Sequence, residues 1–210
     1  LGAQMAEYLL EKSRVVRQAD GERNFHVFYY IFGGAPEDTK DRFGFTDITD
    51  FHYLRGGHRN VTRDVAIDLD IQQLTAQYKS LMEVMEGIGF SQEETDSMHA
   101  IIAGVLHLGN IDFYEAESSF AAISADSPIK TVAHLLGLNV DTLCDMMVST
   151  VSVLRGELLQ KNFNVEKAED NRDALAKVCC LVLSLRVRAC ACSCACACSC
   201  ACACVCVCVH

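Results

Sequence analysis

The sequence of 210 residues contains no tryptophan and only two prolines, Pro36 and Pro128. No apolar run reaches the roughly 18–20 residues that a membrane-spanning helix needs, so we expect no membrane span. The first residues, LGAQMAEYLLEKSR, lack a secretory pattern and do not begin with methionine, which suggests the middle of a longer polypeptide. Outside a C-terminal repeat three cysteines remain, Cys144, Cys179 and Cys180, and so few scattered cysteines suit a reducing compartment.

Basic side chains are also scarce, because the formal net charge is −10. Arg186 and Arg188 are the charged residues that follow Cys179, so residues 1–178 are more acidic than the whole chain. A negative field repels phosphate backbones at long range. The charge therefore argues against nucleic acid as a partner, and an anionic partner would need a local basic or apolar patch.

Short motifs with a defined chemistry are missing too. The sequence has no GxxxxGK[ST] phosphate loop, no GxSxG nucleophile elbow and no HExxH zinc motif. His99 and His107 lie on one predicted helix but too far apart to share a metal without a third ligand between them. The residues therefore indicate no catalytic group, no nucleotide-binding group and no metal site.

What is present is a pattern of helices with a few short strands. FHVFYYIF (residues 25–32) predicts a buried helix or strand that stops at GGAP, and residues 43–60 predict irregular structure. Apolar residues at helical spacing predict a helix that ends near Gly87 and Gly89. Ser91 and Glu94 form a capping box for a helix that Gly109 and Asn110 close, and a strand is expected at residues 111–114.

The second half continues this pattern. Residues 115–127 predict a loop, and Ser127 with Pro128 predicts the start of a helix. Asp141 is the expected cap of the next helix, with its apolar side facing inward (Leu143, Met146 and Met147). A short strand at residues 151–153 should lead into LRGELLQKNF, and Asn164 should cap a last helix. The predicted fold class is α/β and helix-rich.

Three stretches of sequence are distinctive enough to compare with a known protein family, although they contain no catalytic or binding motif. They are GAQMAEYLLEKSRVVRQADGERNFHVFYYIFGG (residues 2–34), AIIAGVLHLGNIDF (residues 100–113) and RDALAK (residues 172–177). In this order they resemble the segment after switch I, the upper 50K helix and strand, and the start of a long helix in a myosin motor domain. The resemblance covers most of residues 1–178 and is of the unconventional type. It implies a slice of a P-loop NTPase-type motor domain.

The resemblance also implies where some residues belong. Residues 2–16 would supply a strand near the energy-transducing sheet, followed by charged residues from Glu11 to Arg14, and Glu22, Arg23 and Asn24 would open the next helix. Charges beside apolar strands are consistent with a partly buried ion-pair network that holds sheet and helix in register. Ordinary surface pairing, worth about 0–1 kcal/mol, is the alternative that the sequence leaves open.

Two segments would face actin filaments, the partner that the resemblance implies. One is residues 115–127 and the other is TVSVLRGELLQKNFN (residues 150–164). Actin is acidic, and Arg155 is the best single candidate for a contact, with a solvated loop charge as the alternative. The full set of expected actin-binding residues is Val153, Leu154, Arg155, Glu157 and Lys161.

The resemblance implies an actin-activated ATPase that uses Mg-ATP, with light chains or calmodulin on a neck and a place in the cytoplasmic actin cytoskeleton. Phosphoryl transfer needs a phosphate loop, Mg²⁺ and an oriented water. The phosphate loop and switch I would precede Leu1, and switch II would follow residues 172–177. We therefore expect this stretch alone to bind no nucleotide and to hydrolyse no ATP.

The C-terminal part differs from the rest. Ten cysteines occupy every second position from Cys190 to Cys208. Most of residues 186–210 can be written in codons that alternate purine and pyrimidine, as in a translated dinucleotide repeat. We divide the chain into a partial motor domain, residues 1–178, and an unstructured or non-native tail, residues 179–210, which we interpret as translated intron. The alternative is a non-enzymatic actin-binding or thiol-rich metal-binding protein, since clustered thiolates bind zinc or copper(I).

Overall fold

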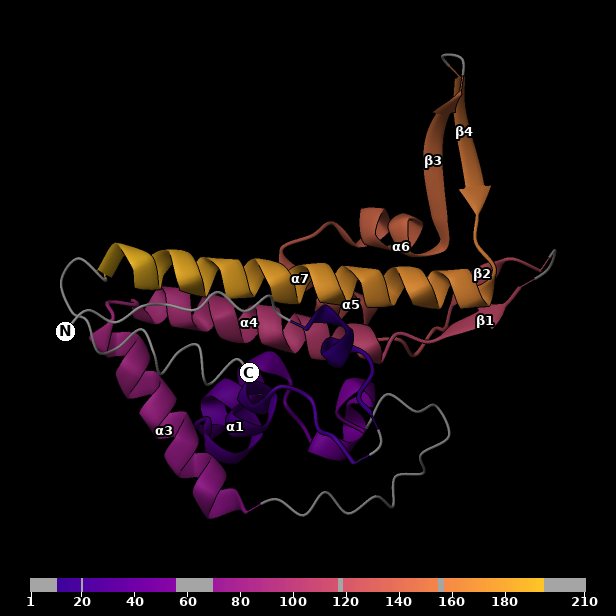
Figure 1. The fold of residues 1–210 in the computed structure, drawn as a ribbon. Coiled ribbons are helices and arrows are strands. Elements are labelled where there is room, and N and C mark those ends of the chain that lie inside the picture. The colour runs from indigo at the N-terminus through magenta and orange to yellow at the C-terminus, as the bar shows by residue number, and fades with distance from the viewer. Residues whose placement is uncertain (1–10, 20, 56–69, 117–118, 155–156, 195–210) are drawn as a thin grey trace.

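The computed structural model describes residues 11–19, 21–55, 70–116, 119–154 and 157–194 (Figure 1). The elements in chain order are η1 (Lys12–Val15), α1 (His26–Gly34), α2 (Glu37–Phe43), η2 (Ile48–Asp50), η3 (His52–Leu54), α3 (Ile71–Gly87), α4 (Gln92–Gly109), β1 (Phe113–Glu115), β2 (Ala121–Ile123), α5 (Ile129–Leu136), α6 (Val140–Val148), β3 (Ser149–Leu154), β4 (Glu157–Asn162) and α7 (Val165–Cys194), where η marks a short 3₁₀ helix.

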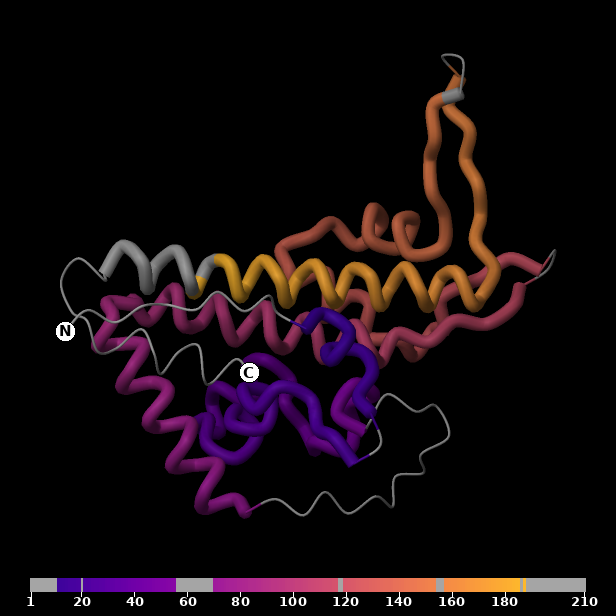
Figure 2. The backbone as a smooth tube through the Cα atoms, viewed as in Figure 1, coloured from indigo at the N-terminus to yellow at the C-terminus, as the bar shows by residue number. Residues whose placement is uncertain are grey.

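Two long helices, α4 and α7, lie side by side through the middle of the molecule (Figure 1). Helices α1 and α3 pack together on one side of α4, while α5 and α6 continue the helical packing on the other. Among the described residues the strands form two antiparallel pairs, β1 with β2 and β3 with β4. The β3–β4 hairpin projects away from the helices, as the tube in Figure 2 shows most clearly. The predicted helix-rich α/β character is therefore confirmed.

Helix α4 begins and ends where the sequence predicts. The Ser91 hydroxyl accepts a hydrogen bond from the Glu94 amide at 3.2 Å, and the Glu94 carboxylate accepts one from the Ser91 amide at 3.0 Å. This reciprocal box satisfies two amides at the helix start that have no partner within the helix. The predicted apolar stripe is buried at Met98, Ile102, Val105 and Leu106. Its burial against α5, α7 and η3 provides the tertiary stabilisation that a helix of this length needs.

Helix α7 also begins as predicted, because the Asn164 side chain accepts a hydrogen bond from the Lys167 amide at 2.9 Å. The helix runs without a break from Val165 to Cys194. The expectation of an unstructured tail is therefore wrong for residues 179–194, which continue α7 past the proposed boundary. Cys180, Ser184 and Val187 are buried on its inner face. Residues 195–210 lie outside the described residues.

Two predicted caps are wrong. Helix α6 is capped by Asn139, whose side chain accepts a hydrogen bond from the Thr142 amide at 3.0 Å, because the helix begins one residue before Asp141. Helix α5 begins after Pro128 without a side-chain cap. The hydroxyl of Ser127 instead accepts a hydrogen bond from the Asp112 amide at 3.0 Å, which ties this turn to the residues just before β1.

Four other expectations are corrected. Residues 115–127 are not simply a loop, because Ala121–Ile123 form β2 and pair with β1. Residues 43–60 contain η2 and η3, and α2 precedes them, so part of this segment is regular. Met146 was expected inside but is 52% exposed, because it lies on the outer side of α6 while Leu143 and Met147 are buried. The predicted strand at residues 111–114 occurs two residues later as β1.

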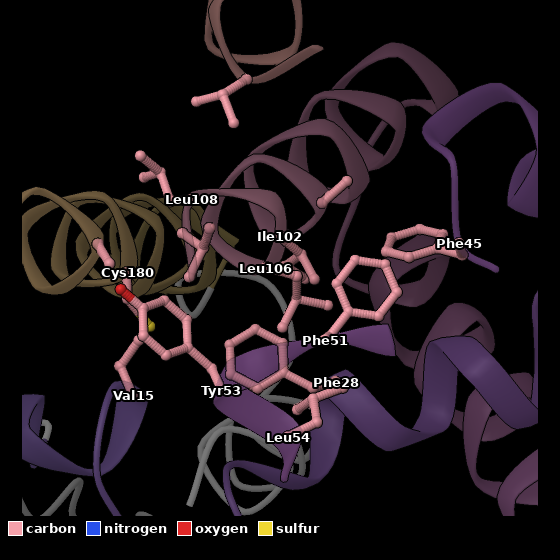
Figure 3. Packing of buried hydrophobic residues seen from close by; sticks show 14 of the residues in the cluster. Val15, Phe28, Phe45, Phe51, Tyr53, Leu54, Ile102, Leu106, Leu108 and Cys180 are labelled. Atoms are coloured by element: carbon pink, nitrogen blue, oxygen red, sulfur yellow. The ribbon is translucent and has the colours of Figure 1, made fainter. Parts of the chain in front are cut away.

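The main core lies where α1, the η3 turn and α4 meet (Figure 3). Phe28, Phe51 and Tyr53 are among its largest fully buried side chains. In Figure 3 they face Ile102, Leu106 and other apolar residues. Burying side chains of this size contributes about 1.5–3 kcal/mol each relative to leaving them exposed.

Two glycines allow α1 and α3 to approach closely. A Cβ atom at Gly34 would lie 2.8 Å from Cγ of Tyr78, and one at Gly33 would overlap the side chain of Leu74. Real Cβ atoms do not come so close. The Gly-Gly pair that the sequence marks as a helix stop therefore has a second role, because it removes side-chain volume from the α1–α3 contact.

Candidate functional site

The β3–β4 hairpin is exposed to solvent along most of its described length. Its register pairs Val153 with Leu158, Ser152 with Leu159 and Thr150 with Lys161. Directly opposed residues lie on the same face of an antiparallel pair, and alternate residues share that face. The hairpin therefore has an apolar face, made of Val151, Val153 and Leu158, and a mixed face that carries Leu159 and Lys161.

Large apolar side chains on this hairpin are strongly exposed. Leu158 is 76% exposed and Val153 is 70% exposed, and Val151 and Leu159 also lie mostly in solvent. Single exposed apolar residues are ordinary, but a contiguous exposed patch marks an interaction surface more often. The hairpin has no second layer to cover it in the described residues (Figure 1).

The structure brings together some of the residues expected to bind actin and separates others. Val153 lies on the apolar face, whereas Lys161 lies on the mixed face, and Glu157 pairs with Leu154 at the hairpin end on that same mixed face. Arg155, the best single candidate, lies outside the described residues, as does the side chain of Leu154. The segment predicted as a strand followed by a loop is two paired strands.

The sequence reasoning missed Val151, Leu158 and Leu159 as members of this surface. A signal for them existed, because a second strand after the Arg155-Gly156 dipeptide would place Leu158 directly opposite Val153. Glycine at a short connection between two apolar segments indicates a hairpin. The polar residues of the second segment hid this pattern.

The base of the hairpin is fastened to the body by backbone and side-chain hydrogen bonds. The Phe163 amide donates to the Val148 carbonyl at 2.8 Å, and the Ala121 amide of β2 donates to the Phe163 carbonyl at 2.8 Å. The Ser149 hydroxyl donates to the Asp145 carbonyl at 3.0 Å. Phe163 itself packs into a small buried cluster with Ala121 and Ala168. The hairpin is thus held at its base and exposed along its length.

A second, buried arrangement joins two of the resembling stretches of sequence, residues 100–113 and 172–177, to Tyr53. Arg172 of α7 is 5% exposed and donates a hydrogen bond to the Ile111 carbonyl at 2.9 Å, just beyond the end of α4. It also pairs with the Asp173 carboxylate at 2.8 Å. Tyr53 donates its hydroxyl to the same carboxylate at 2.7 Å. Burial is the main cause that raises the pKa of Tyr53 well above its ordinary value, so this hydroxyl stays protonated and donates.

Asn110 completes this junction from the other side. Its side-chain oxygen accepts a hydrogen bond from the His52 amide at 2.9 Å, and its side-chain nitrogen donates to the Asp50 carbonyl at 2.9 Å. The two bonds hold the η2–η3 segment against the end of α4. We call the group of Arg172, Asp173, Tyr53 and Asn110 the buried junction. It fixes where α7, and therefore the base of the hairpin, lies on α4.

The charged residues near the described N-terminal segment form the expected ion pairs. Arg14 Nε lies 2.8 Å from a Glu11 carboxylate oxygen, and Arg14 Nη1 lies 2.9 Å from one of Glu22. The Arg14 side chain is 26% exposed, whereas its partners are 58% and 50% exposed. Because the carboxylates lie largely in solvent, this small network is closer to surface pairing than to a buried lock. Asn24 does not open α1 as a cap but bonds the carbonyls of Val15 and Tyr53.

The family model of the myosin head (motor domain) matches residues 1–184, so the chain belongs to the myosin motor domain family. The match extends six residues beyond the boundary proposed at residue 178. It disfavours the thiol-rich metal-binding protein as the alternative, because most of the chain belongs to a motor domain.

Relatives of known name agree with this assignment. The chain is 37% identical over 182 residues to human myosin-IIIa, covering 84% of this chain and 11% of that protein. It is 36% identical over 178 residues to chicken unconventional myosin-Ic, covering 84% of this chain and 17% of that protein. It is 35% identical over 186 residues to human unconventional myosin-XV, covering 87% of this chain and 5% of that protein. The chain thus spans less than a fifth of each of these relatives, and the expected unconventional type is confirmed.

None of the described helices combines the length and the apolar character that crossing a membrane requires. The described residues also contain no cluster of three or more histidine, cysteine or acidic side chains that could hold a metal ion. Cys144, Cys179 and Cys180 are free thiols, and burial raises the pKa of Cys180 to about 12, which makes it unreactive as a thiolate.

Proposed function

We propose that this chain is part of an ATP-driven motor that moves on actin filaments, and that the β3–β4 hairpin is a docking surface for the filament. The single observation that carries the docking proposal is the exposed apolar face of Val151, Val153 and Leu158 on a hairpin fastened only at its base. Covering each such side chain is worth about 1.5–3 kcal/mol, which favours a protein partner at this site.

Charge on the hairpin complements this apolar contact. Lys161 lies on the mixed face, and Arg155 lies between the two strands in sequence. Actin is acidic, so basic residues at this surface speed encounter and orient the approach, while the apolar face sustains the bound state. Arg155 remains our best single candidate for a contact with the filament. Glu157 is acidic and offsets part of the positive charge that Arg155 and Lys161 bring to the hairpin.

The rest of the motor cycle belongs to the longer protein. There we propose that Mg-ATP binds to a phosphate loop, switch I and switch II outside this stretch, that light chains or calmodulin bind a neck, and that the motor works on the cytoplasmic actin cytoskeleton. The proposed role of this stretch is to carry actin-facing segments and part of the transducer. On this proposal the 210 residues alone bind no nucleotide.

The docking proposal is tested in an intact motor that carries this sequence. Replacing Val153 and Leu158 together with serine should lower the affinity for actin filaments at least about tenfold in co-sedimentation, because two apolar contacts are lost. Replacing Val178 with serine is the matched control, since Val178 is a 54% exposed apolar residue on α7. Equal affinities for the two variants would overturn the proposal.

The role of charge has its own test. Arg155→Glu in the same motor should weaken actin binding and make it less sensitive to salt, because a cation facing an acidic filament is replaced by an anion. Lys40→Glu is the control, since Lys40 lies on α2 and pairs locally with Glu37 at 2.9 Å. If Arg155→Glu left the salt-dependent affinity unchanged, Arg155 would be a solvated loop charge.

We also propose that the cysteine repeat is translated intron, with the change of character near Val178. The family match ends at residue 184 and the cysteine repeat begins at Cys190, which supports a change of character in this part of the chain. Sequencing of the mature transcript across Lys177 to Cys190 tests this. A spliced message that replaces the repeat supports it, and a translated message that contains the repeat contradicts it.

A further inference from the structure

A small apolar cavity lies between α1, α3, α4 and α7, with a volume of about 40 Å³. A buried water needs roughly 10–15 Å³ of such space and also about two to four polar partners. The surface that lines this cavity is apolar and supplies no such partners. The surrounding side chains therefore lack contacts on the side that faces the cavity, which lowers the stability of the packing.

The side chains on three sides of this cavity are large. Phe28 of α1, Met85 of α3 and Ile102 of α4 are each at most 2% exposed. On the fourth side α7 contributes Cys180 and Ser184, which lie one helical turn apart and are 6% and 7% exposed. These two are the smallest side chains in the lining. The missing volume is therefore on the α7 side.

The inner face of α7 is otherwise packed through this region. Ala176, Cys180 and Val187 are buried at helical spacing, and Leu183 packs against the same core. Ser184 is the polar member of this buried set, although a hydroxyl gains nothing from apolar surroundings. A helix displaced from the body would leave all of these positions loose. Here the loss of volume is confined to two neighbouring turns, so the side chains and not the helix position are at fault.

We propose that this cavity is the place of two larger apolar side chains, which the longer motor carries at positions 180 and 184 of α7. On this proposal Cys180 and Ser184 are the first residues of foreign sequence to meet the core. The proposal rests on the interpretation of the cysteine repeat as translated intron, and it puts the change of sequence at or before Cys180. The family match through residue 184 agrees with this, because a chain 37% identical to a relative differs from it at most positions.

A first test fills the cavity in the 210-residue chain. Ser184→Leu adds apolar volume from the α7 side, and Ser184→Ala is the matched control that removes the hydroxyl and leaves the cavity. The leucine variant should melt about 2–4 °C higher than the alanine variant in a thermal unfolding experiment followed by circular dichroism. Equal melting temperatures, or a lower one for leucine, would overturn the proposal.

An exposed position on the same helix controls for a general gain from leucine. Leu185 is 53% exposed, so the difference between leucine and alanine at this position should be at most about half as large as at Ser184. A difference at Leu185 that matched the one at Ser184 would mean that the gain does not come from the cavity. That result would also contradict the proposal.

Position 180 has a matched pair of its own. Burial raises the pKa of Cys180 to about 12, so its thiol stays neutral and behaves as a small apolar group. Cys180→Val adds one carbon atom towards the cavity, and Cys179→Val makes the same change at a partly exposed neighbour that does not line it. The Cys180 variant should melt at least about 1 °C higher than the Cys179 variant. Equal melting temperatures would remove position 180 from the proposal and contradict it there.

The mature message tests the proposal even if the chain gives no sharp melt. A spliced message should encode, at the positions of Cys180 and Ser184, apolar residues larger than cysteine and serine. Small or polar residues at both positions would overturn this proposal and leave the intron interpretation intact. A mature message that retains the cysteine repeat would contradict both. The two failures are therefore distinguishable.

Discussion

The buried junction keeps charged and polar side chains out of solvent, whereas the β3–β4 hairpin exposes apolar ones. In the junction, Arg172 is 5% exposed and its charge is met by Asp173 and by the Ile111 carbonyl. On the hairpin, Leu158 is 76% exposed and lies opposite Val153 in the register of the two strands. A satisfied buried group stabilises the fold, whereas an exposed apolar one contributes to stability only after a partner covers it. If the docking proposal holds, the comparison separates residues that stabilise the fold from residues that bind a partner.

The largest expected effect is on the junction. Arg172→Leu should lower the free energy of unfolding of the 210-residue chain by about 3–5 kcal/mol, because Asp173 and the Ile111 carbonyl lose a buried cation. Arg42→Leu is the control, since Arg42 is 63% exposed, and should change stability by less than about 1 kcal/mol. Urea unfolding followed by circular dichroism measures both. Similar losses for the two arginines would remove the distinction between junction and surface.

A pair of leucines sharpens the same comparison. Leu108→Ala should lower stability by about 2–5 kcal/mol, because Leu108 is fully buried at the end of α4. Leu158→Ala should change it by no more than about 0.5 kcal/mol, because that side chain is already in solvent. The shift in urea midpoint at constant slope reports each value. A large loss for Leu158→Ala would mean that the hairpin belongs to the core.

Asn110 tests the junction at a single hydrogen-bonding side chain. Asn110→Ala leaves the His52 amide and the Asp50 carbonyl without this partner and should cost about 1–3 kcal/mol. Asn139→Ala, which removes the α6 cap, should cost about 1 kcal/mol and serves as the comparison. Thermal melts of the two variants rank them. The reverse order would show that the η2–η3 segment is held by its apolar residues alone.

The smallest expected effect is a dependence on pH. Burial lowers the pKa values of both His99 and His107 in the folded chain, against an ordinary value of about 6.5 in the unfolded one. The unfolded chain therefore binds more protons below pH 6.5, and stability falls as pH decreases. At pH 5.5, about one unit lower, the loss is at most about 1.4 kcal/mol for each histidine. His107→Gln should reduce the slope of stability against pH, measured by urea unfolding at several pH values.

The sequence predicted local structure better than it predicted long-range contacts. The capping box at Ser91 and the cap at Asn164 could be found because each depends on residues within one helical turn. The cap of α6 was misplaced because Asn139 and Asp141 are both good caps and only the packing of Leu143 and Met147 sets where the helix begins. The pairing of β2 with β1 was missed because its residues are small and its register depends on the neighbouring α6 and α7.

The candidate site shows the same limit. Val153 and Lys161 were selected from their position in the resembling family, and the strand at residues 151–153 was predicted from alternation. The sequence did not reveal that Leu158 lies opposite Val153. Pairing across a turn depends on the strand register, and the polar residues of β4 obscure that register. The buried junction was also invisible, since Tyr53 and Asp173 are far apart in sequence and meet only in the fold.

The most direct test of the account compares the two regions in one experiment. Amide hydrogen exchange is measured on an intact motor carrying this sequence, with and without actin filaments. We predict that amides in residues 149–154 and 157–162 gain protection on the filament, while those near Asn110, Ile111 and Arg172 are already protected and change little. Equal exchange of the hairpin amides in the free and filament-bound motor would contradict the proposal that this hairpin is a docking surface.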